Sequence, residues 1–196
     1  MTLKLGELSL SELADYILQC HYLSAEEEAL IEADSRSGAK KLLEQYRRRV
    51  YKRQQAESRW HDMLVEEKDL WSKGLSSVAG VDEAGRGPLA GPVVAAAVVF
   101  KPDTFISGLN DSKQLSKLSR ERLFDQIILE AVDYGLGSAS CKEIDDLNIH
   151  AASMLAMQRA IGSLRNNPDY VIVDGFQIKG CVYKQKALIK GDAKSV

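Results

Sequence analysis

Cysteine is scarce in this sequence, and its three residues are not arranged for a disulfide framework or a zinc site. Cys20, Cys141 and Cys181 are odd in number, widely spaced and without a C-x-x-C pair. No apolar run approaches the roughly 18 residues that cross a bilayer. The N-terminus also lacks the basic start, apolar block and small-residue cleavage site of a signal peptide. We therefore expect a cytoplasmic protein with no membrane partner.

A large net charge is also missing, because 26 Lys and Arg residues against 28 Asp and Glu residues leave only −2. A globally basic field that would attract a polyanion is thereby excluded. Binding to nucleic acid would have to come from local patches and from a metal ion.

Proline is absent from the first 73 residues, where glycine is rare and charged helix formers recur. Ser9–Glu12 and Ser24–Glu27 fit the S-x-x-E capping box, so two short helices should begin there. A third, longer helix is expected from Ala39 to Leu70. We interpret residues 1–73 as a helical N-terminal arm and residues 74–196 as a second domain.

The long helix is strongly basic, and two interpretations of that charge stay open. One is an arm that contacts phosphates, which adds affinity for nucleic acid without sequence specificity. The other is a solvated helix whose charges pair with the acidic 26–28 stretch. The basic residues between positions 40 and 59 are Lys40, Lys41, Arg47, Arg48, Arg49, Lys52, Arg53 and Arg59, against Glu44 and Glu57.

The stretch Val78–Phe100 is typical of a strand, a turn and a second strand, because two apolar runs flank a glycine-rich segment. The turn contains Gly85, Arg86, Gly87 and Gly91. Its glycines permit positive φ and let backbone N–H groups come close to an anionic ligand.

Asp82 and Glu83 stand at the mouth of this turn. Successive strand residues point to opposite faces, so we expect the strand to bend or stop there if both carboxylates share a site. Paired carboxylates repel unless a cation neutralises them, and hard ions such as Mg²⁺ take carboxylate oxygens. A solvated Asp-Glu turn is the plainer alternative. A phosphate-binding P-loop is excluded, since Gly85 is not followed by Lys-Ser/Thr.

Farther along, helices are expected at 120–132, capped by Ser119, and at 149–165, with a strand at 134–140 between them. The run 170–174 is a buried strand that ends in a carboxylate, and 181–189 is a last strand or hairpin arm. Open α/β sheets bind ligands at carboxyl strand ends, which makes Asp174 the natural third metal ligand. A lone acid after a strand is otherwise often only an N-cap or turn former, which is the plainer alternative.

The segment Val81–Val93, VDEAGRGPLAGPV, resembles the signature of bacterial ribonuclease HII, the type 2 ribonuclease H. The resemblance runs from about residue 75 to the end of the chain. It continues through LNDSKQLS at 109–116, IDDLNIHA at 144–151, DYVIVDG at 169–175 and IKGDAKSV at 189–196.

This resemblance implies a ribonuclease H-like α/β fold: a central mixed sheet flanked by helices, in which the first strand lies beside the strand ending at Asp174. It implies that Asp82, Glu83 and Asp174 bind Mg²⁺ or Mn²⁺ and are catalytic. The expected activity is endonucleolytic cleavage of RNA in RNA–DNA hybrids and nicking of DNA duplexes 5′ to embedded ribonucleotides, as in ribonucleotide excision repair. The ends produced would be 5′-phosphate and 3′-hydroxyl.

The resemblance also implies substrate contacts. Gly85, Arg86 and Gly87 would read the 2′-hydroxyl, and Lys113, Lys190 and Lys194 would face the nucleic-acid backbone; ordinary surface lysines are the alternative. His150 could face the substrate, but we expect it to be a partly buried structural residue.

The family pattern continues past Val196 into a helix that carries a fourth carboxylate, so we expect the chain to end inside a structural unit. The complete protein is expected to be a monomer. Two alternatives to the nuclease remain open: a non-catalytic nucleic-acid-binding module that lacks the fourth carboxylate, and a different metal-dependent nuclease without a 2′-hydroxyl requirement.

Overall fold

A computed structural model describes residues 5–88, 90–109 and 115–188 of the chain. The chain forms two compact units, Met1–Ser58 and Arg59–Val196. The division falls inside a helix, and each unit has its own hydrophobic core. We describe each unit by itself.

The first unit is built from short helices around one apolar cluster. It contains η1 (Leu5–Glu7), α1 (Leu10–Gln19), α2 (Ala25–Glu32) and most of α3 (Ser37–Met63). Both predicted capping boxes are confirmed, with Ser9 and Ser24 as the N-caps. The buried cluster consists of Leu5, Leu13, Ile17, Leu23, Ile31, Ala39, Leu43 and Tyr46.

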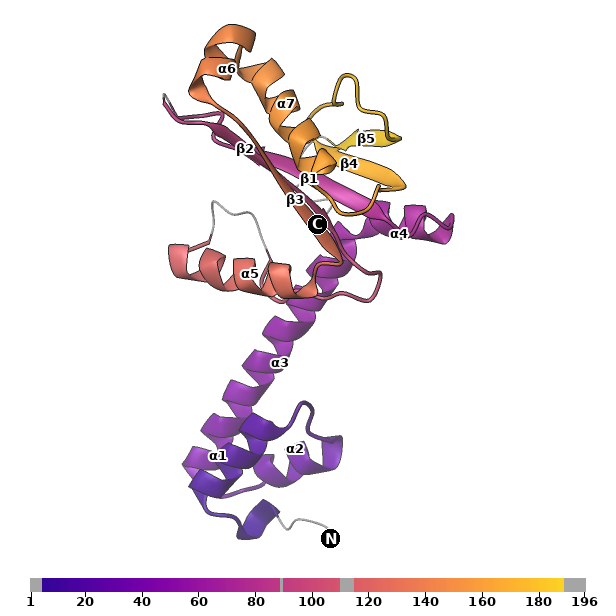
Figure 1. The fold of residues 1–196 in the computed structure, drawn as a ribbon. Coiled ribbons are helices and arrows are strands. Elements are labelled where there is room, and N and C mark those ends of the chain that lie inside the picture. Colours follow the sequence, from indigo (N-terminus) through magenta and orange to yellow (C-terminus); the bar gives the residue numbers. More distant parts are fainter. Residues whose placement is uncertain (1–4, 89, 110–114, 189–196) are drawn as a thin grey trace. The chain divides into compact units, whose positions relative to one another are not determined.

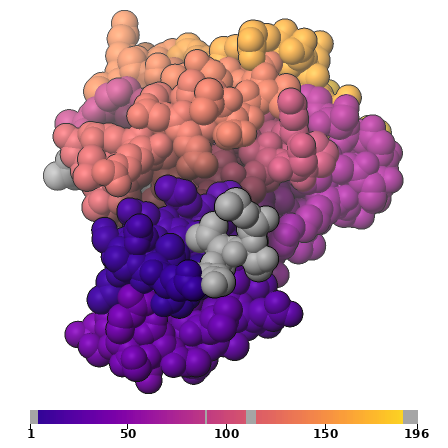
Figure 2. Space-filling model, turned by 90° about the horizontal axis from the view of Figure 1, so that it is seen from below, coloured from indigo at the N-terminus to yellow at the C-terminus, as the bar shows by residue number. Residues whose placement is uncertain are grey.

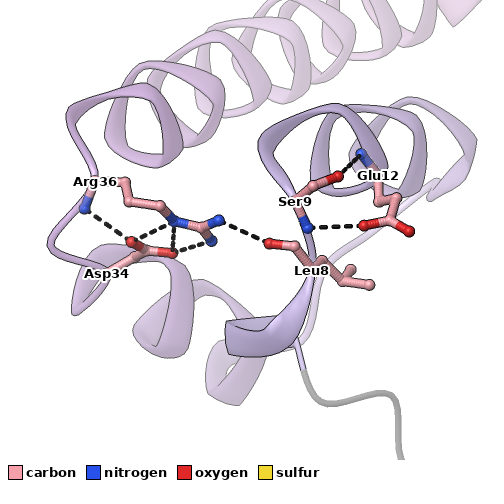
Figure 3. A network of polar contacts seen from close by, with 5 residues as sticks. All are labelled: Leu8, Ser9, Glu12, Asp34 and Arg36. Atoms are coloured by element: carbon pink, nitrogen blue, oxygen red, sulfur yellow. Dashed lines mark hydrogen bonds and ion pairs between the residues drawn. The ribbon is translucent and has the colours of Figure 1, made fainter.

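A polar network joins the segment before α1 to the segment before α3 (Figure 3). The Arg36 guanidinium donates from Nε to both carboxylate oxygens of Asp34 at 3.0 Å, and from Nη1 to the Leu8 carbonyl at 2.7 Å. The Glu12 carboxylate accepts from the Ser9 N–H at 2.8 Å. Charge-assisted bonds of this kind fix the path of the chain between helices.

The prediction of one helix from Ala39 to Leu70 is wrong at Leu64. There the chain leaves helical geometry (φ −91°, ψ 15°), and α4 (Val65–Ser72) begins after it. Leu64 is buried with Trp60 and Phe100, while the Trp60 indole donates to the Thr104 carbonyl at 3.0 Å. These contacts belong to the second unit, so tertiary packing sets this boundary against a sequence of continuous helix formers.

The second unit is organised around a five-stranded mixed sheet with the order β3-β2-β1-β4-β5. Its strands are β1 (Val78–Ala84), β2 (Val93–Val99), β3 (Asp133–Ala139), β4 (Tyr170–Asp174) and β5 (Gln185–Leu188). β1 pairs antiparallel with β2 and parallel with β4. The predicted α/β class and the predicted pairing of the first strand with the strand ending at Asp174 are confirmed.

Helix α7 (Ile149–Gly162) covers one face of this sheet (Figure 1). Glycine on β3 permits the close approach, because a Cβ on Gly137 would lie 2.1 Å from the Ala156 carbonyl oxygen and one on Gly135 2.2 Å from that of Ala160. Val81, Val93, Val171 and Val173 point into the same cluster as Met157 of the helix.

The opposite face is covered by different elements. Leu70 of α4 packs with Val78, Ile172 and Leu188, and α5 (Lys117–Glu130) contributes Leu123 to a second cluster around Trp60. The outward side of α5 is exposed, with Phe124 59% and Leu129 82% accessible, and this segment lies at the surface in Figure 2. The sheet therefore has helices on both faces.

Several details differ from the sequence-based expectation: α7 ends at Gly162 and not at 165, and β5 begins at Gln185 and not at 181. Helix α5 begins at Lys117, because the Ser116 hydroxyl caps it by accepting from the Ser119 N–H at 3.1 Å. A further short helix, α6 (Cys141–Leu147), was not predicted and starts with a capping box at Ser140. Among the described residues, no helix is both long and apolar enough to cross a membrane.

Candidate nucleic-acid cleavage site

The predicted end of the first strand is wrong, since β1 continues through Asp82 and Glu83 to Ala84. Asp82 pairs with Ala96 of β2, and Glu83 pairs with Ala95. Because side chains alternate along a strand, the two carboxylates belong to opposite faces of the sheet.

Asp82 and Asp174 come together on one face. The parallel register of β1 and β4 ends with Val81 opposite Val173, so the next positions along it are Asp82 and Asp174. Alternation puts both carboxylates on the face where Ile172 packs with α4. Neighbouring parallel strands therefore supply two hard oxygen ligands at their carboxyl ends, where open sheets bind ligands.

Glu83 lies instead on the face of the sheet that α7 covers, and its side chain pairs with Arg86. Its side chain is only 8% exposed, and its Oε1 accepts from Nη1 of Arg86 at 2.9 Å. The Arg86 guanidinium carbon lies 5.3 Å from the centroid of the Phe176 ring. Glu83 thus fixes the side chain of the arginine in the glycine turn.

The turn itself is closed tightly by glycine. Gly85 has φ 97°, and a Cβ there would lie 2.6 Å from the Pro92 carbonyl oxygen. Gly91 has φ 121°. The predicted positive φ is confirmed at these two positions, whereas Gly87 does not adopt it. A residue with a side chain at Gly85 would open the turn between β1 and β2.

Within residues 5–88, 90–109 and 115–188, no three His, Cys, Asp or Glu side chains are gathered to hold a metal ion. The assignment of Asp82, Glu83 and Asp174 as ligands stays a prediction, supported by geometry for the two aspartates. Lys113, Lys190 and Lys194 lie outside the described residues.

The expectation of a partly buried His150 is wrong, because this residue is exposed at the start of α7. Its ring packs against Phe176, with the centroids 4.4 Å apart and the planes at 52°. The role of Phe176 was missed. Its sequence signal is only that it follows Asp174 and Gly175, and sequence spacing does not show which rings meet.

The sequence model of the family described as Ribonuclease HII matches residues 79–195, and that of the Ribonuclease HII N-terminal domain matches residues 9–71. The first match alone covers more than half of the chain. This chain belongs to the ribonuclease HII family.

Curated members of the ribonuclease HII family are similar over most of this chain. The ribonuclease HII of Bacillus pumilus is 48% identical over 85% of the chain, and that of Acetivibrio thermocellus is 44% identical over 80%. The chain spans 65% and 61% of the length of these two relatives. The activity of these longer relatives is therefore only proposed for this chain.

Solved structures agree on the fold. The ribonuclease H2 of Pyrococcus horikoshii is 32% identical, with a TM-score of 0.52 over 60% of this chain and 64% of that protein. The Q54A mutant of Bst-RNase HIII is 19% identical with a TM-score of 0.52, covering 62% of this chain and 47% of its own, and shows the fold alone.

Proposed function

We propose that this chain is the nuclease portion of an endonuclease that cleaves RNA in RNA–DNA hybrids and nicks DNA 5′ to embedded ribonucleotides. The observation that carries the proposal is the adjacent placement of Asp82 and Asp174, beside the Gly85–Gly87 turn, in a chain of the ribonuclease HII family. In this proposal residues 74–196 are the catalytic domain, and residues 1–73 are an accessory arm.

The donor set fits a divalent cation. Two carboxylates at neighbouring register positions on one face of the sheet supply oxygens that suit Mg²⁺ or Mn²⁺. When bound, such an ion supplies Lewis-acid activation of a water and stabilisation of the leaving oxygen. The backbones of Asp82 and Asp174 are held at fixed positions because each lies at the carboxyl end of a hydrogen-bonded strand.

Substrate choice would come from the glycine turn. The 2′-hydroxyl is the group by which a protein distinguishes RNA from DNA, and a glycine turn lets backbone groups reach a sugar. Gly85 and Gly87 would supply that backbone, while Arg86, held by Glu83, offers a cation to a phosphate. The proposed products carry 5′-phosphate and 3′-hydroxyl ends.

A second candidate is a module that binds nucleic acid without cutting it. Two observations favour it: the Glu83 carboxylate is engaged by Arg86, and no metal-binding group of three side chains is gathered among the residues that the structure describes. Such a module would still distinguish a ribonucleotide through the turn.

One assay separates these candidates. A labelled DNA duplex with one ribonucleotide is incubated with the protein in Mg²⁺ or in Mn²⁺, beside an all-DNA duplex of the same sequence. We expect a nick 5′ to the ribonucleotide and no cutting of the all-DNA duplex. Binding without a nick supports the second candidate, and cutting of both duplexes shows a nuclease without the 2′-hydroxyl requirement.

A further inference from the structure

Phe176 connects the arginine of the glycine turn to the first turn of α7. Its ring centroid lies 5.3 Å from the Arg86 guanidinium carbon and 4.4 Å from the centroid of the His150 imidazole. The three residues come from the β1–β2 turn, the end of β4 and the start of α7. One aromatic ring therefore contacts a guanidinium and an imidazole from separate elements.

The ring is held in place by its backbone and its packing. Gly175 has φ 82° and donates its N–H to the Leu188 carbonyl at 2.8 Å, which turns the chain after β4. The Phe176 side chain is half-buried against the cluster formed by the sheet and α7. His150 in turn has its backbone N–H bonded to the Asn148 cap at 3.1 Å.

Arg86 is consequently restrained from two directions. Glu83 accepts a charge-assisted hydrogen bond from its guanidinium, and the face of an aromatic ring attracts the same cation. An arginine ordered before binding loses less conformational freedom when it meets a phosphate. Without these two contacts, an exposed arginine in a turn would adopt several side-chain orientations.

We propose that Phe176, supported by His150, is a positioning residue that fixes the Arg86 guanidinium for the sugar-phosphate backbone of the substrate. This inference rests on the proposed function, in which the Gly85–Gly87 turn meets the ribonucleotide. Phe176 acts through Arg86 and touches no reacting group. The alternative is that Phe176 only fills the core.

The first test observes Arg86 directly in the whole chain, without metal or nucleic acid. The Nε–Hε resonance of Arg86 is assigned by comparison with Arg86→Gln. A ring close to the guanidinium should shift that resonance, so Phe176→Leu should move it towards the random-coil position and Phe176→Tyr should leave it near the wild-type position. An unmoved resonance in Phe176→Leu would overturn the proposal.

Phe124→Leu is the matched control, because Phe124 is an exposed phenylalanine on α5, outside the turn. It should leave the Arg86 resonance unchanged. If Phe176→Leu does not fold, as judged by its amide spectrum, Phe176→Met replaces it, and an unmoved Arg86 resonance in that variant would overturn the proposal. His150→Ala should move the Arg86 resonance in the same direction as Phe176→Leu by a smaller amount, and no movement would overturn the support assigned to His150.

The second test is a double-mutant cycle on binding of a fluorescein-labelled duplex with one ribonucleotide in EDTA. We expect Phe176→Leu to weaken binding by about 3- to 10-fold, the range of a partly exposed cation–π contact. In the Arg86→Gln background the same change should have no further effect. Equal losses in both backgrounds would make Phe176 a core residue only.

The proposed function and the positioning role can fail separately. If the protein neither prefers the ribonucleotide duplex nor cuts it, the proposed function is wrong, while the Arg86 resonance still reports whether Phe176 orders the guanidinium. If the preference is present and the Arg86 resonance ignores Phe176, only the positioning role is wrong.

Discussion

At the residue scale, Glu143 shows how charge pairing ties α6 to the rest of the second unit. Its carboxylate accepts from Nη2 of Arg159 at 2.7 Å and from the Ser140 N–H at 2.9 Å. The hydrogen bond from Arg159, then those from Ser140, lower the pKa of Glu143 from 4.5 to about 2. Arg159 also donates to the Ser138 carbonyl, so the ion pair joins α6, α7 and β3.

This pKa gives a testable dependence of stability on pH. A carboxyl whose folded pKa is depressed contributes stability that is fully present above its unfolded pKa and is lost as pH falls through the folded pKa. For Glu143 the loss should extend from about pH 4.5 down to about pH 2. We expect Glu143→Gln to lower Tm at pH 7 and to flatten the fall of Tm over this acid range.

Thermal unfolding followed by circular dichroism measures this effect. Glu130→Gln at the exposed end of α5 is the control and should leave the acid slope unchanged. A parallel fall of Tm with pH in Glu143→Gln and in the wild type would show that the ion pair does not contribute to acid stability.

Sequence reasoning at this scale singled out Asp82, Glu83 and Arg86 because they stand between apolar runs, and Asp174 because it ends a buried strand; their roles stay predictions. It did not separate the two neighbouring carboxylates, since that depends on whether β1 continues past them. The link from Arg86 through Phe176 to His150 also escaped it, because the three lie far apart in sequence and only the packing of β4 against α7 joins them.

At the element scale, β3 depends on glycine to let α7 lie against the sheet. A Cβ at Gly137 would lie 2.1 Å from the Ala156 carbonyl oxygen, and helix backbone cannot move aside as the end of a flexible side chain does. We expect Gly137→Ala to lower the free energy of unfolding by at least the about 1–3 kcal/mol typical of overpacking. Chemical denaturation measures it, with Ser138→Ala on the exposed side of β3 as control.

A Gly137→Ala variant as stable as Ser138→Ala would show that α7 can shift away from β3 without loss of stability. The predicted strand at 134–140 matches β3 closely, but its burial was not foreseeable, because its two glycines are buried while the larger Tyr134 and Leu136 are exposed. Close approach of a helix to glycine leaves no local pattern in the sequence.

Helix α3 resolves part of the question left open by its basic residues. Arg47 binds Glu28 and Glu32, Arg48 binds Glu44, and Arg53 binds Glu57. The Arg49 guanidinium donates to the Ile17 carbonyl at 2.6 Å. These contacts favour the interpretation in which the four arginines pair with groups of the protein itself, and not with phosphates. Lys41 and Lys52, both exposed, are the better candidates for phosphate contact.

The double variant Lys41→Gln, Lys52→Gln should therefore weaken duplex binding and flatten its salt dependence. The slope of log K against log salt should fall by about 0.9 for each phosphate that the variant no longer neutralises. Anisotropy titrations at several salt concentrations measure it, with Lys101→Gln in the second unit as a control for removal of a surface lysine. An unchanged slope would leave the arm with a structural role only.

Deleting the whole arm is a poorer test of its role in binding than substituting these two lysines. Removing residues through Leu70 would take away Trp60 and Leu64, which pack with Phe100 in the second unit. Weaker binding would then report damage to the sheet domain. The sequence does not show that Trp60 and Leu64 pack with the second unit, because both look like ordinary residues of the single long helix expected from composition.

At the scale of the whole molecule, the mixed sheet and the neighbouring positions of β1 and β4 were predictable from the resemblance of the signature stretch, whereas the places of β3 and β5 were not predicted. The mixed sheet with β1 between β2 and β4 follows that expectation. The division of the chain at Ser58–Arg59 did not follow from composition, since charged helix formers continue across it.

The central claim is that Asp82 and Asp174, adjacent on β1 and β4, carry the cutting of a ribonucleotide-containing duplex. The most direct measurement compares the wild type, Asp82→Asn, Asp174→Asn and Asp125→Asn on the single-ribonucleotide duplex in Mn²⁺. Asp125 is an exposed carboxylate on α5 and serves as the control. Folding of each variant is verified by its Tm.

We predict a nick by the wild type and by Asp125→Asn, and a loss of at least about 100-fold in both Asp82→Asn and Asp174→Asn, because each removes one anionic ligand without changing the shape of the side chain. Folded Asp82→Asn and Asp174→Asn variants that cut at the wild-type rate would contradict the claim.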